Sequence, residues 1–456
     1  MQLPDWSFYC KGLQRKVNMP KILTEKRILI FILFIAFFVR FTSLIVFMYK
    51  NNITVHESGM TAYPQGDDSQ LYYQTAINLA LGKGYSISVT DPNQKLPESF
   101  KPSIIPNTYF HNYYPPVYSS FLSMLYRFFG TSIFVYAIPQ IIIGVITCYL
   151  TYIIAKGVFP TKVGLMASFL LSIYHPIVWW TSYIRTETLF IFLLLLAVVF
   201  LIKAVKNNLN TGNTILSGLF LTVACLCRTA VLYLPIFIVF YFIMIFYKKD
   251  KKRLLYGMAI FLLSFYISLL PWAYRNYTVY HKFAITTTEA WDAFYACNVT
   301  SAVLPFFDLY EVKYDQEKED DIALLMASKG VKEASIAFVK KHPLKYLKLC
   351  TKRFLAYWGP ITKKPSFAKK VADTFIYIIV FPMAFYGFYK SKWWVINSKS
   401  GFNPIPALLM TVILYYTILH SLVGVDDALI YRYPIIPLIC IFSAYGYYAY
   451  FKPSKS

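Results

Sequence analysis

Two adjacent carboxylates, Asp67 and Asp68, are the side chains of this sequence best suited to acid–base chemistry. They follow Pro64 and Gly66, which favour a turn, and they precede an amphipathic pattern over residues 69–81 that predicts a helix. A carboxylate within hydrogen-bond distance of a hydroxyl or amine can act as a general base. Carboxylates at this position can equally cap the helix N-terminus. The local sequence leaves both interpretations open.

Arginines form the second chemical pattern. Five arginines lie in or beside long apolar runs: Arg40, Arg185, Arg228, Arg275 and Arg432. Glu187 lies two residues after one of them, Arg185. The planar guanidinium offers five donors that fit phosphate oxygens. A single arginine near a membrane span can also extend to the interface or pair at a helix end. The set as a whole predicts a site for an anionic lipid head group, such as a phosphate or pyrophosphate.

The composition places these residues in a membrane protein. Apolar residues make up 57% of the 456 residues and charged residues 15%, whereas soluble domains are nearer half apolar and a quarter charged. This excludes an ordinary cytosolic enzyme, a disordered chain and a nucleic-acid module. The net charge of +23 is then better explained by basic cytoplasmic loops than by nucleic acid as a partner.

About ten apolar runs are candidates for transmembrane helices. They cover residues 28–48, 131–155, 163–180, 186–205, 214–228, 230–247, 254–271, 371–390, 404–421 and 433–451. With a cytoplasmic N-terminus, the inner segments hold 20 of the 45 basic residues. The positive-inside rule therefore predicts that both termini are cytoplasmic, in the plasma (inner) membrane, and that polar chemistry occurs at the outer face.

Three regions follow from this topology. Residues 1–271 form an N-terminal transmembrane module with an outer loop at 49–116, residues 272–370 form a large external loop, and residues 371–456 form C-terminal transmembrane helices. The short run 117–129 suits an interfacial or re-entrant helix. The pattern over 320–357 predicts a helix that lies in the interface or packs on the protein. The fold class is thus all-α and polytopic, with helical outer loops.

The order and spacing of several short motifs resemble the GT-C superfamily of membrane glycosyltransferases. The nearest resemblance is to its family 39, the bacterial protein O-mannosyltransferases and lipid A aminoarabinose transferases. It covers nearly the whole chain, and it is carried by Arg40, Asp68 with Tyr72, Gly82 to Tyr85, Pro115 to Tyr118, Arg185 to Glu187, Gly218 to Arg228, Pro271 to Tyr277, Asn298, and Arg432 to Pro437.

The resemblance implies a polyprenyl-phosphate sugar donor, an external active site and inversion at the sugar carbon. It makes Asp68 the expected base, with Asp67 as its neighbour and possible substitute, and it puts Glu187 at the position of a second acidic residue. Arg275 and Arg432 are expected to hold the lipid phosphate, followed by Arg228, Arg185 and Arg40. Tyr72, His111 and Tyr114 are expected to contact substrate. The acceptor is expected to be an envelope lipid, glycan or protein.

Other functions stay open at this point. A polymerase or ligase of surface polysaccharide shares outward arginines, and a flippase or transporter would place polar groups near the membrane midplane. A structural membrane subunit would not need these arginines. His111 with the carboxylates could bind a divalent metal ion. Of the seven cysteines, Cys297 and Cys350 are in the large external loop, where they could form a disulfide or stay free.

Overall fold

The computed structural model describes residues 7–53, 67–89, 100–287, 290–295, 297–298, 330–359, 367–392, 404–424 and 428–452. Helices dominate this part of the chain. The first half contains α1 (Ser7–Lys50), α2 (Asp67–Ala80), α3 (Pro116–Phe129), α4 (Ile133–Val158), α5 (Thr161–Ser172), α6 (His175–Trp180), α7 (Glu187–Lys206) and α8 (Thr211–Cys225).

The second half of the chain continues the helical arrangement. It contains η2 (Thr229–Val231), α9 (Leu234–Phe246), α10 (Lys251–Ile267), α11 (Leu270–Tyr280), α12 (Ala290–Tyr295), α14 (Val331–Lys341), α15 (Pro343–Trp358), α16 (Phe367–Lys390), α17 (Ile405–Val423), α18 (Ala428–Arg432), η6 (Tyr433–Ile435) and α19 (Ile436–Phe451).

Seven helical segments in the described part are long and apolar enough to cross a membrane. They are Thr24–Lys50, Ile133–Val158, Glu187–Lys206, Thr229–Phe246, Lys251–Tyr280, Ile405–Val423 and Ile430–Phe451. The remaining predicted runs coincide with α5 and α6, α8 and α16. Every predicted run is therefore helical, while the number of membrane crossings stays a prediction. The run 163–180 is divided, because the helix breaks between Ser172 and His175.

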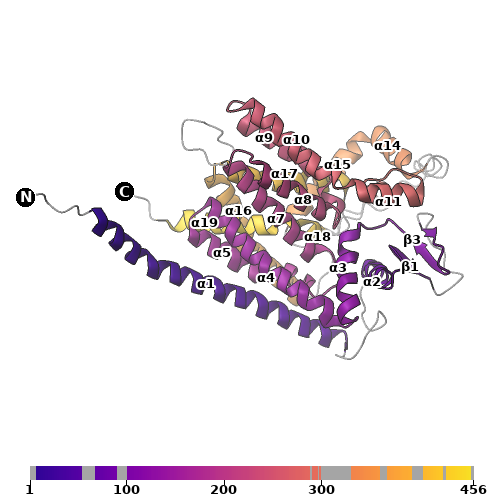
Figure 1. The fold of residues 1–456 in the computed structure, drawn as a ribbon, viewed down its shortest axis with the longest axis horizontal. Helices are drawn as coiled ribbons and strands as arrows, with labels where there is room; N and C mark the ends of the chain where they lie inside the picture. Colours follow the sequence, from indigo (N-terminus) through magenta and orange to yellow (C-terminus); the bar gives the residue numbers. More distant parts are fainter. Residues whose placement is uncertain are drawn as a thin grey trace, which may run out of the picture.

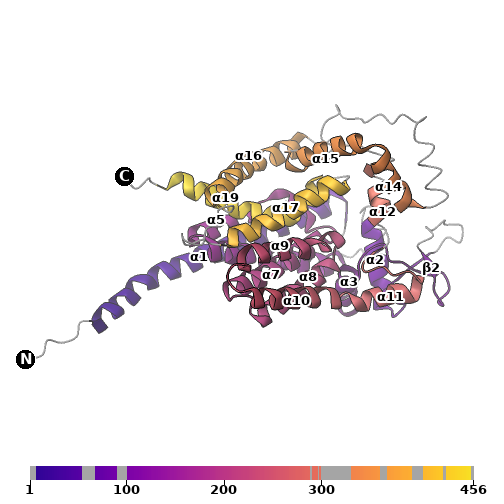
Figure 2. The same cartoon turned by 90° about the horizontal axis from the view of Figure 1, so that it is seen from above.

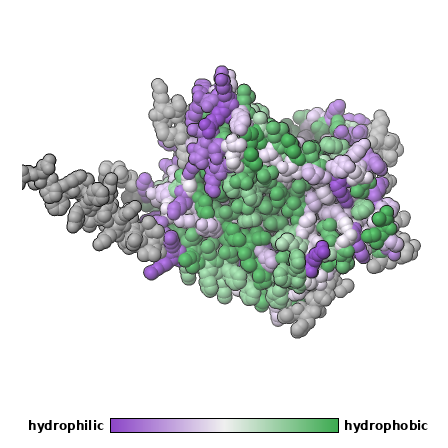
Figure 3. Space-filling view, viewed as in Figure 1, coloured by the Kyte–Doolittle hydropathy of each residue, from purple (hydrophilic) through white to green (hydrophobic). Residues whose placement is uncertain are grey.

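The helices form a bundle with two different ends. Figure 1 shows the free ends of α1 and α19 on one side of the molecule and α2, α11 and the strands on the other. On the face in Figure 3, apolar residues cover a broad continuous area over the middle of the bundle, and hydrophilic residues gather toward its edges. This distribution is expected of a protein whose middle faces lipid. In Figure 2, α15 and α16 form an outer arc, α17 lies inside it, and α7, α8 and α10 lie beyond.

Small residues allow the closest helix packing. A Cβ added to Gly387 of α16 would lie 1.9 Å from the Phe442 carbonyl oxygen, and one added to Gly446 of α19 would lie 2.0 Å from the Met383 carbonyl oxygen. Only glycine permits this backbone approach, which is typical of helix pairs in membranes. The contact fastens the C-terminal helix to α16 and so places the segment that begins with Arg432.

The first outer loop contains a small sheet that the helical prediction did not include. Strands β1 (Ser86–Ser88), β2 (Lys101–Pro102) and β3 (Thr108–Phe110) are antiparallel in the order β1-β3-β2, and Ser86 pairs with Phe110. Strands of two or three residues are too short for an alternating pattern to be visible in the sequence. The sheet places His111, one of the predicted site residues, directly after β3.

Two further predicted helices are present in these loops. Residues 67–80 form α2 and residues 116–129 form α3, close to the predicted ranges. The stretch predicted at 320–357 forms α14 and α15 from Val331 onward, and its first residues, 320–329, lie outside the described part.

Candidate active site

Asp68 lies in the first turn of α2 and accepts hydrogen bonds on both carboxylate oxygens. The Tyr114 hydroxyl donates to Oδ1, and the Arg185 guanidinium forms an ion pair with Oδ2. The Asp68 side chain is 42% exposed and that of Arg185 22%. Each carboxylate oxygen has two acceptor positions, so Asp68 can still accept from a substrate group. The side chain of Asp67, the first residue of α2, lies outside the described part.

The link between α6 and α7 carries Arg185 to Asp68 and is itself held by buried polar contacts. Gln140, inside α4, donates from Nε2 to the carbonyls of Thr181 (3.2 Å) and Tyr183 (2.8 Å). Ser69, the neighbour of Asp68, donates to the Ile184 carbonyl at 3.0 Å. Two adjacent residues of α2 thus bind two adjacent residues of the link. These side-chain to backbone hydrogen bonds hold the link and the Asp68 carboxylate in one arrangement.

Tyr72 and Tyr114 form an aromatic wall beside Asp68. Tyr72 is one turn after Asp68 on α2, and its ring stacks on that of Tyr114 with 4.5 Å between centroids. Burial raises the pKa of both phenols above the ordinary value of 10.0. Tyr114 therefore stays a neutral hydrogen-bond donor to Asp68, and the structure brings together three of the residues predicted for the site.

Glu187 and Arg228 form a second ion pair next to the first. Glu187 begins α7, two residues after Arg185, and the Arg228 guanidinium is 2.6 Å from Glu187 Oε1. Glu187 is 6% exposed and Arg228 19%. The guanidinium also lies over the Tyr431 ring, 4.9 Å from its centroid. The acidic and basic residues predicted at 185–187 and 228 thus lie in one region, where each cation is paired with a carboxylate.

His111 and Arg275 lie at the sheet and contact its strands and the residues beside them. Arg275 donates to the backbone carbonyls of His111 and Tyr85, both at 3.1 Å, and it lies among aromatic rings, with the Trp272 centroid 4.8 Å away. His111 Nε2 is 2.8 Å from the Thr75 hydroxyl. Burial is the main reason that the pKa of His111 is lowered from 6.5 to about 3, so its imidazole is neutral. His111 contacts Thr75, Arg275 and the rings of Tyr85 and Phe100, and it lies apart from the Asp68 ion pair.

Arg432 and Arg40 are fully buried and have backbone acceptors. Arg432 donates to the carbonyls of Tyr357 and Gly359, both at 2.8 Å, and its Nε has no hydrogen-bond partner in the described part. Arg40 donates to the Ala36 carbonyl at 3.0 Å and contacts α4 and α5. The predicted phosphate-binding arginines are therefore divided among separate places, and the partners of Arg40 belong to the helix bundle.

The described residues of this region do not form a metal site. Within the described ranges, no three His, Cys, Asp or Glu side chains gather closely enough to hold a metal ion. Asp68 and Glu187 are each occupied by an arginine instead. Cys297 and Cys350 are not joined by a disulfide in this structure.

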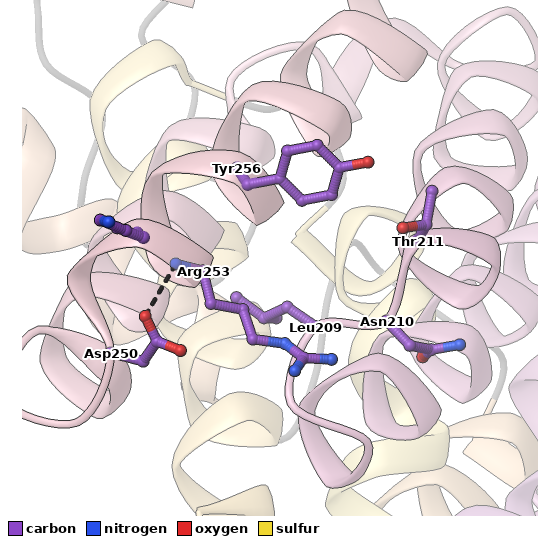
Figure 4. Close-up of a pocket in the computed structure, with 7 residues that line it drawn as sticks. Leu209, Asn210, Thr211, Asp250, Arg253 and Tyr256 are labelled. Atoms are coloured by element: carbon purple, nitrogen blue, oxygen red, sulfur yellow. Dashed lines mark hydrogen bonds between the residues drawn. The ribbon is translucent and has the colours of Figure 1, made fainter.

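A shallow hollow of about 430 Å³ lies elsewhere, where the α7–α8 link meets the start of α10 (Figure 4). Asn210, Thr211, Arg253 and Tyr256 line it. Asp250 caps α10 there by accepting a hydrogen bond from the Arg253 backbone N–H at 3.0 Å. None of the predicted site residues lines the hollow, and we assign it no part in the candidate site.

Sequence reasoning gave no role to two residues that hold this region, Gln140 and Tyr85, although Tyr85 lies in one of the resembling motifs. Gln140 is a polar amide inside an otherwise apolar span, and that exception was the available signal. Its Oε1 accepts from the Tyr118 hydroxyl at 3.1 Å while its Nε2 holds the link. Tyr85 donates its hydroxyl to the Tyr114 carbonyl at 2.9 Å, a contact that no local pattern indicates.

Comparisons with known proteins agree with this architecture. Residues 114–272 match the family described as dolichyl-phosphate-mannose-protein mannosyltransferase. The archaeal oligosaccharyltransferase AglB from Archaeoglobus fulgidus, in complex with an inhibitory peptide and a dolichol-phosphate, is similar over 94% of this chain, with 15% identity and a TM-score of 0.56. An oligosaccharyltransferase from Archaeoglobus fulgidus in complex with Zn and sulfate is similar over 92% of this chain, with 16% identity and a TM-score of 0.55.

The chain spans about half the length of these solved structures, 51% and 49% respectively. No curated protein matches it. The chain has the GT-C fold seen in membrane glycosyltransferases, and its apolar helices are those of a multi-pass membrane protein. The GT-C fold predicted from the motifs is confirmed. Within that class, the matched segment runs from Tyr114 to Trp272 and so includes Arg185, Glu187 and Arg228.

Proposed function

We propose that this protein transfers a sugar from a polyprenyl-phosphate donor to an envelope acceptor, a lipid, glycan or protein, with inversion at the sugar carbon. The observation that carries the proposal is Asp68, a partly exposed carboxylate oriented by Tyr114 and Arg185. A base positioned in this way suits the deprotonation of an attacking group. The mannosyltransferase family match and the dolichol-phosphate bound to AglB support the choice of donor.

The proposed reaction is a single displacement. Asp68 takes the proton from the acceptor hydroxyl or amine as the acceptor attacks the anomeric carbon. The bond from that carbon to the acceptor forms while its bond to the phosphate oxygen breaks, and the electron pair leaves with the lipid phosphate. Arginine donors stabilise the negative charge that develops on the phosphate. The phosphate is already a good leaving group, so no further cofactor enters this scheme.

We assign the donor phosphate to Arg432 in the first place and to Arg275 in the second. The other candidates near the site, Arg185 and Arg228, are each paired with a carboxylate, which compensates their charge. Arg432 has no carboxylate partner in the part that the structure describes, and its buried Nε has no hydrogen-bond partner there. Arg40 and Arg185 also have an unpaired Nε, but Arg40 contacts the helix bundle and Arg185 is paired with Asp68. A buried donor of this kind favours an anionic oxygen as its partner.

The transfer reaction is tested with purified protein in detergent and labelled polyprenyl-phosphate sugars. We expect release of lipid phosphate and appearance of the sugar on an acceptor, and Asp68→Asn reduces the rate about 100-fold or more without loss of folding. Full transfer activity in Asp68→Asn contradicts the assignment of the base. Movement of donor lipid across vesicles without transfer by the unaltered protein favours a flippase.

We propose that the site faces the outside of the cell and that both termini are cytoplasmic. Support comes from the positive-inside rule, because the segments expected in the cytoplasm are rich in Lys and Arg. The most basic of the short ones is Lys248 to Arg253, between α9 and α10. Thr278 of α11 and Lys252 of α10 are both exposed and suit labelling. In intact cells, an impermeant maleimide is expected to label Thr278→Cys and not Lys252→Cys. The reverse pattern overturns the orientation.

A further inference from the structure

Four rings gather beside the second ion pair, and we call them the aromatic cluster: the buried Tyr357 of α15, Tyr416 and His420 of α17, and the partly buried Tyr431 of α18. The His420 ring is central, with centroid distances of 4.9 Å to Tyr431, 5.8 Å to Tyr357 and 5.9 Å to Tyr416. Three helices thus meet at one imidazole, and the Arg228 guanidinium covers the Tyr431 ring of the cluster.

Several polar atoms in and beside this cluster are buried without a hydrogen-bond partner in the described part. They are His420 Nε2, Tyr416 OH, Glu187 Oε2 and Thr188 Oγ1. Tyr416 is fully buried and His420 is 5% exposed. A buried polar atom left unpaired costs on the order of 1–3 kcal/mol. Four such atoms in one region, carrying hydroxyl, imidazole and carboxylate groups, are the chemistry that binds the hydroxyl groups of a ligand.

The charge of the region favours an uncharged ligand. Arg228 and Glu187 are 2.6 Å apart and compensate each other. The aromatic cluster itself contributes rings and neutral donors and acceptors, which suit the alternating C–H faces and hydroxyls of a sugar ring better than a phosphate. A phosphate instead requires an uncompensated cation.

Adjacent residues connect the cluster to the proposed phosphate site. Tyr431 belongs to the cluster, and the next residue, Arg432, donates to the carbonyl of Tyr357, another member. In a polyprenyl-phosphate sugar, the phosphate and the sugar ring are separated by a single oxygen. One donor molecule can therefore place its phosphate at Arg432 and its ring at the cluster.

We infer that Tyr416, His420 and Tyr431, together with the Arg228–Glu187 pair, form the subsite for the donor's sugar, and that this sugar carries no charged substituent. The inference rests on the proposed function and deepens it by assigning the residues that select the sugar. Tyr416 and His420 then act as specificity-determining residues, because their polar atoms bind sugar hydroxyls.

The test compares donor lipids with and without the sugar. Tyr416→Phe removes one hydroxyl, and His420→Phe keeps a ring but removes both nitrogens. Tyr415→Phe is the matched control, because the hydroxyl of Tyr415 is on the same helix but donates to the Ala230 carbonyl at 2.7 Å. Dissociation constants are measured for polyprenyl-phosphate mannose, polyprenyl-phosphate aminoarabinose and sugar-free polyprenyl phosphate, after thermal unfolding has confirmed that each variant is folded.

We expect the two cluster variants to bind polyprenyl-phosphate mannose about fivefold to tenfold more weakly, as the loss of one or two hydrogen bonds implies. Their affinity for sugar-free lipid phosphate stays within about twofold of the unaltered protein, and the control changes neither value. Equal weakening for both lipids, no weakening, or tighter binding of the aminoarabinose lipid by the unaltered protein overturns the inference. If the unaltered protein binds no polyprenyl phosphate at all, the proposed function fails instead.

Discussion

Asp68 is ion-paired to Arg185, a residue 117 positions further along the chain. Since the carboxylate compensates the charge of this guanidinium, we interpret Arg185 as a positioning residue for the base. Its guanidinium also lies over the Trp180 ring, 5.6 Å from the centroid, which fixes it from a second side. Because its charge is compensated by Asp68, Arg185 is not one of the arginines that we propose for the phosphate.

Replacement of Arg185 distinguishes positioning from phosphate binding. We expect Arg185→Met to lower kcat about 100-fold, because a displaced base loses its geometry, and to leave the KM for the donor lipid unchanged. Steady-state kinetics over a range of donor concentrations measures both values. A large increase in donor KM with little change in kcat shows that Arg185 binds the phosphate after all.

The Glu187–Arg228 pair is expected to stabilise the fold through mutual compensation. Glu187→Gln and Arg228→Gln each leave one buried group unpaired and are expected to cost about 3 kcal/mol. The double variant costs less than the sum, because neither charge then remains. Denaturant unfolding in detergent gives the coupling free energy of the cycle. Additive effects mean that the 2.6 Å contact contributes little.

Arg432 and Arg40 are both buried arginines, but only the former is proposed to bind donor. Arg432→Lys keeps the charge and loses the planar fork, and we expect it to raise the donor KM about tenfold, as weaker charge-assisted hydrogen bonds imply. Arg40→Lys is the matched control, since Arg40 donates to carbonyls of α1 and α5. It is expected to lower the melting temperature alone. A rise in KM for the Arg40 variant restores Arg40 as a phosphate contact.

His111 is expected to make the first outer loop sensitive to acid. Its folded-state pKa, about 3, lies below the unfolded value of 6.5. Between these values the unfolded chain binds more protons, so stability is complete above pH 6.5 and falls as the pH is lowered toward 3. From pH 6.5 to 5 the loss is about 2 kcal/mol. Thermal unfolding at both pH values should show a smaller loss for His111→Gln, which keeps a donor and an acceptor without this titration.

Gly424 ends α17 in a conformation that requires glycine. Its φ is +97°, and an added Cβ would lie 2.6 Å from Cys297 Cβ and 3.1 Å from the Arg353 guanidinium. Gly424→Ala therefore combines strain with overpacking, and we expect a loss of about 2–4 kcal/mol in thermal or denaturant unfolding. Gly82→Ala is the control, because Gly82 also has a positive φ, +75°, but open space around its Cβ position. Equal losses for both variants would mean that the contact with Arg353 does not matter.

The membrane architecture could be predicted from the sequence because it depends on local composition. A run of apolar residues, such as 186–205, must form its backbone hydrogen bonds within itself in lipid, so it becomes a helix whatever its neighbours are. The same local logic placed α2 after Asp67 and α3 after Pro115. It did not indicate the three-stranded sheet, whose pairing of Ser86 with Phe110 depends on contacts across the loop.

The types of the site residues were visible in the sequence, and their order matched a known superfamily. Which arginine meets which acceptor was decided only by tertiary structure. Five arginines look alike along the chain, yet Arg185 pairs with Asp68, Arg228 pairs with Glu187, and Arg432 meets backbone carbonyls. The physical reason is that the function of a buried charge depends on what compensates it, and its partners come from helices that are distant in sequence and meet only in the folded bundle.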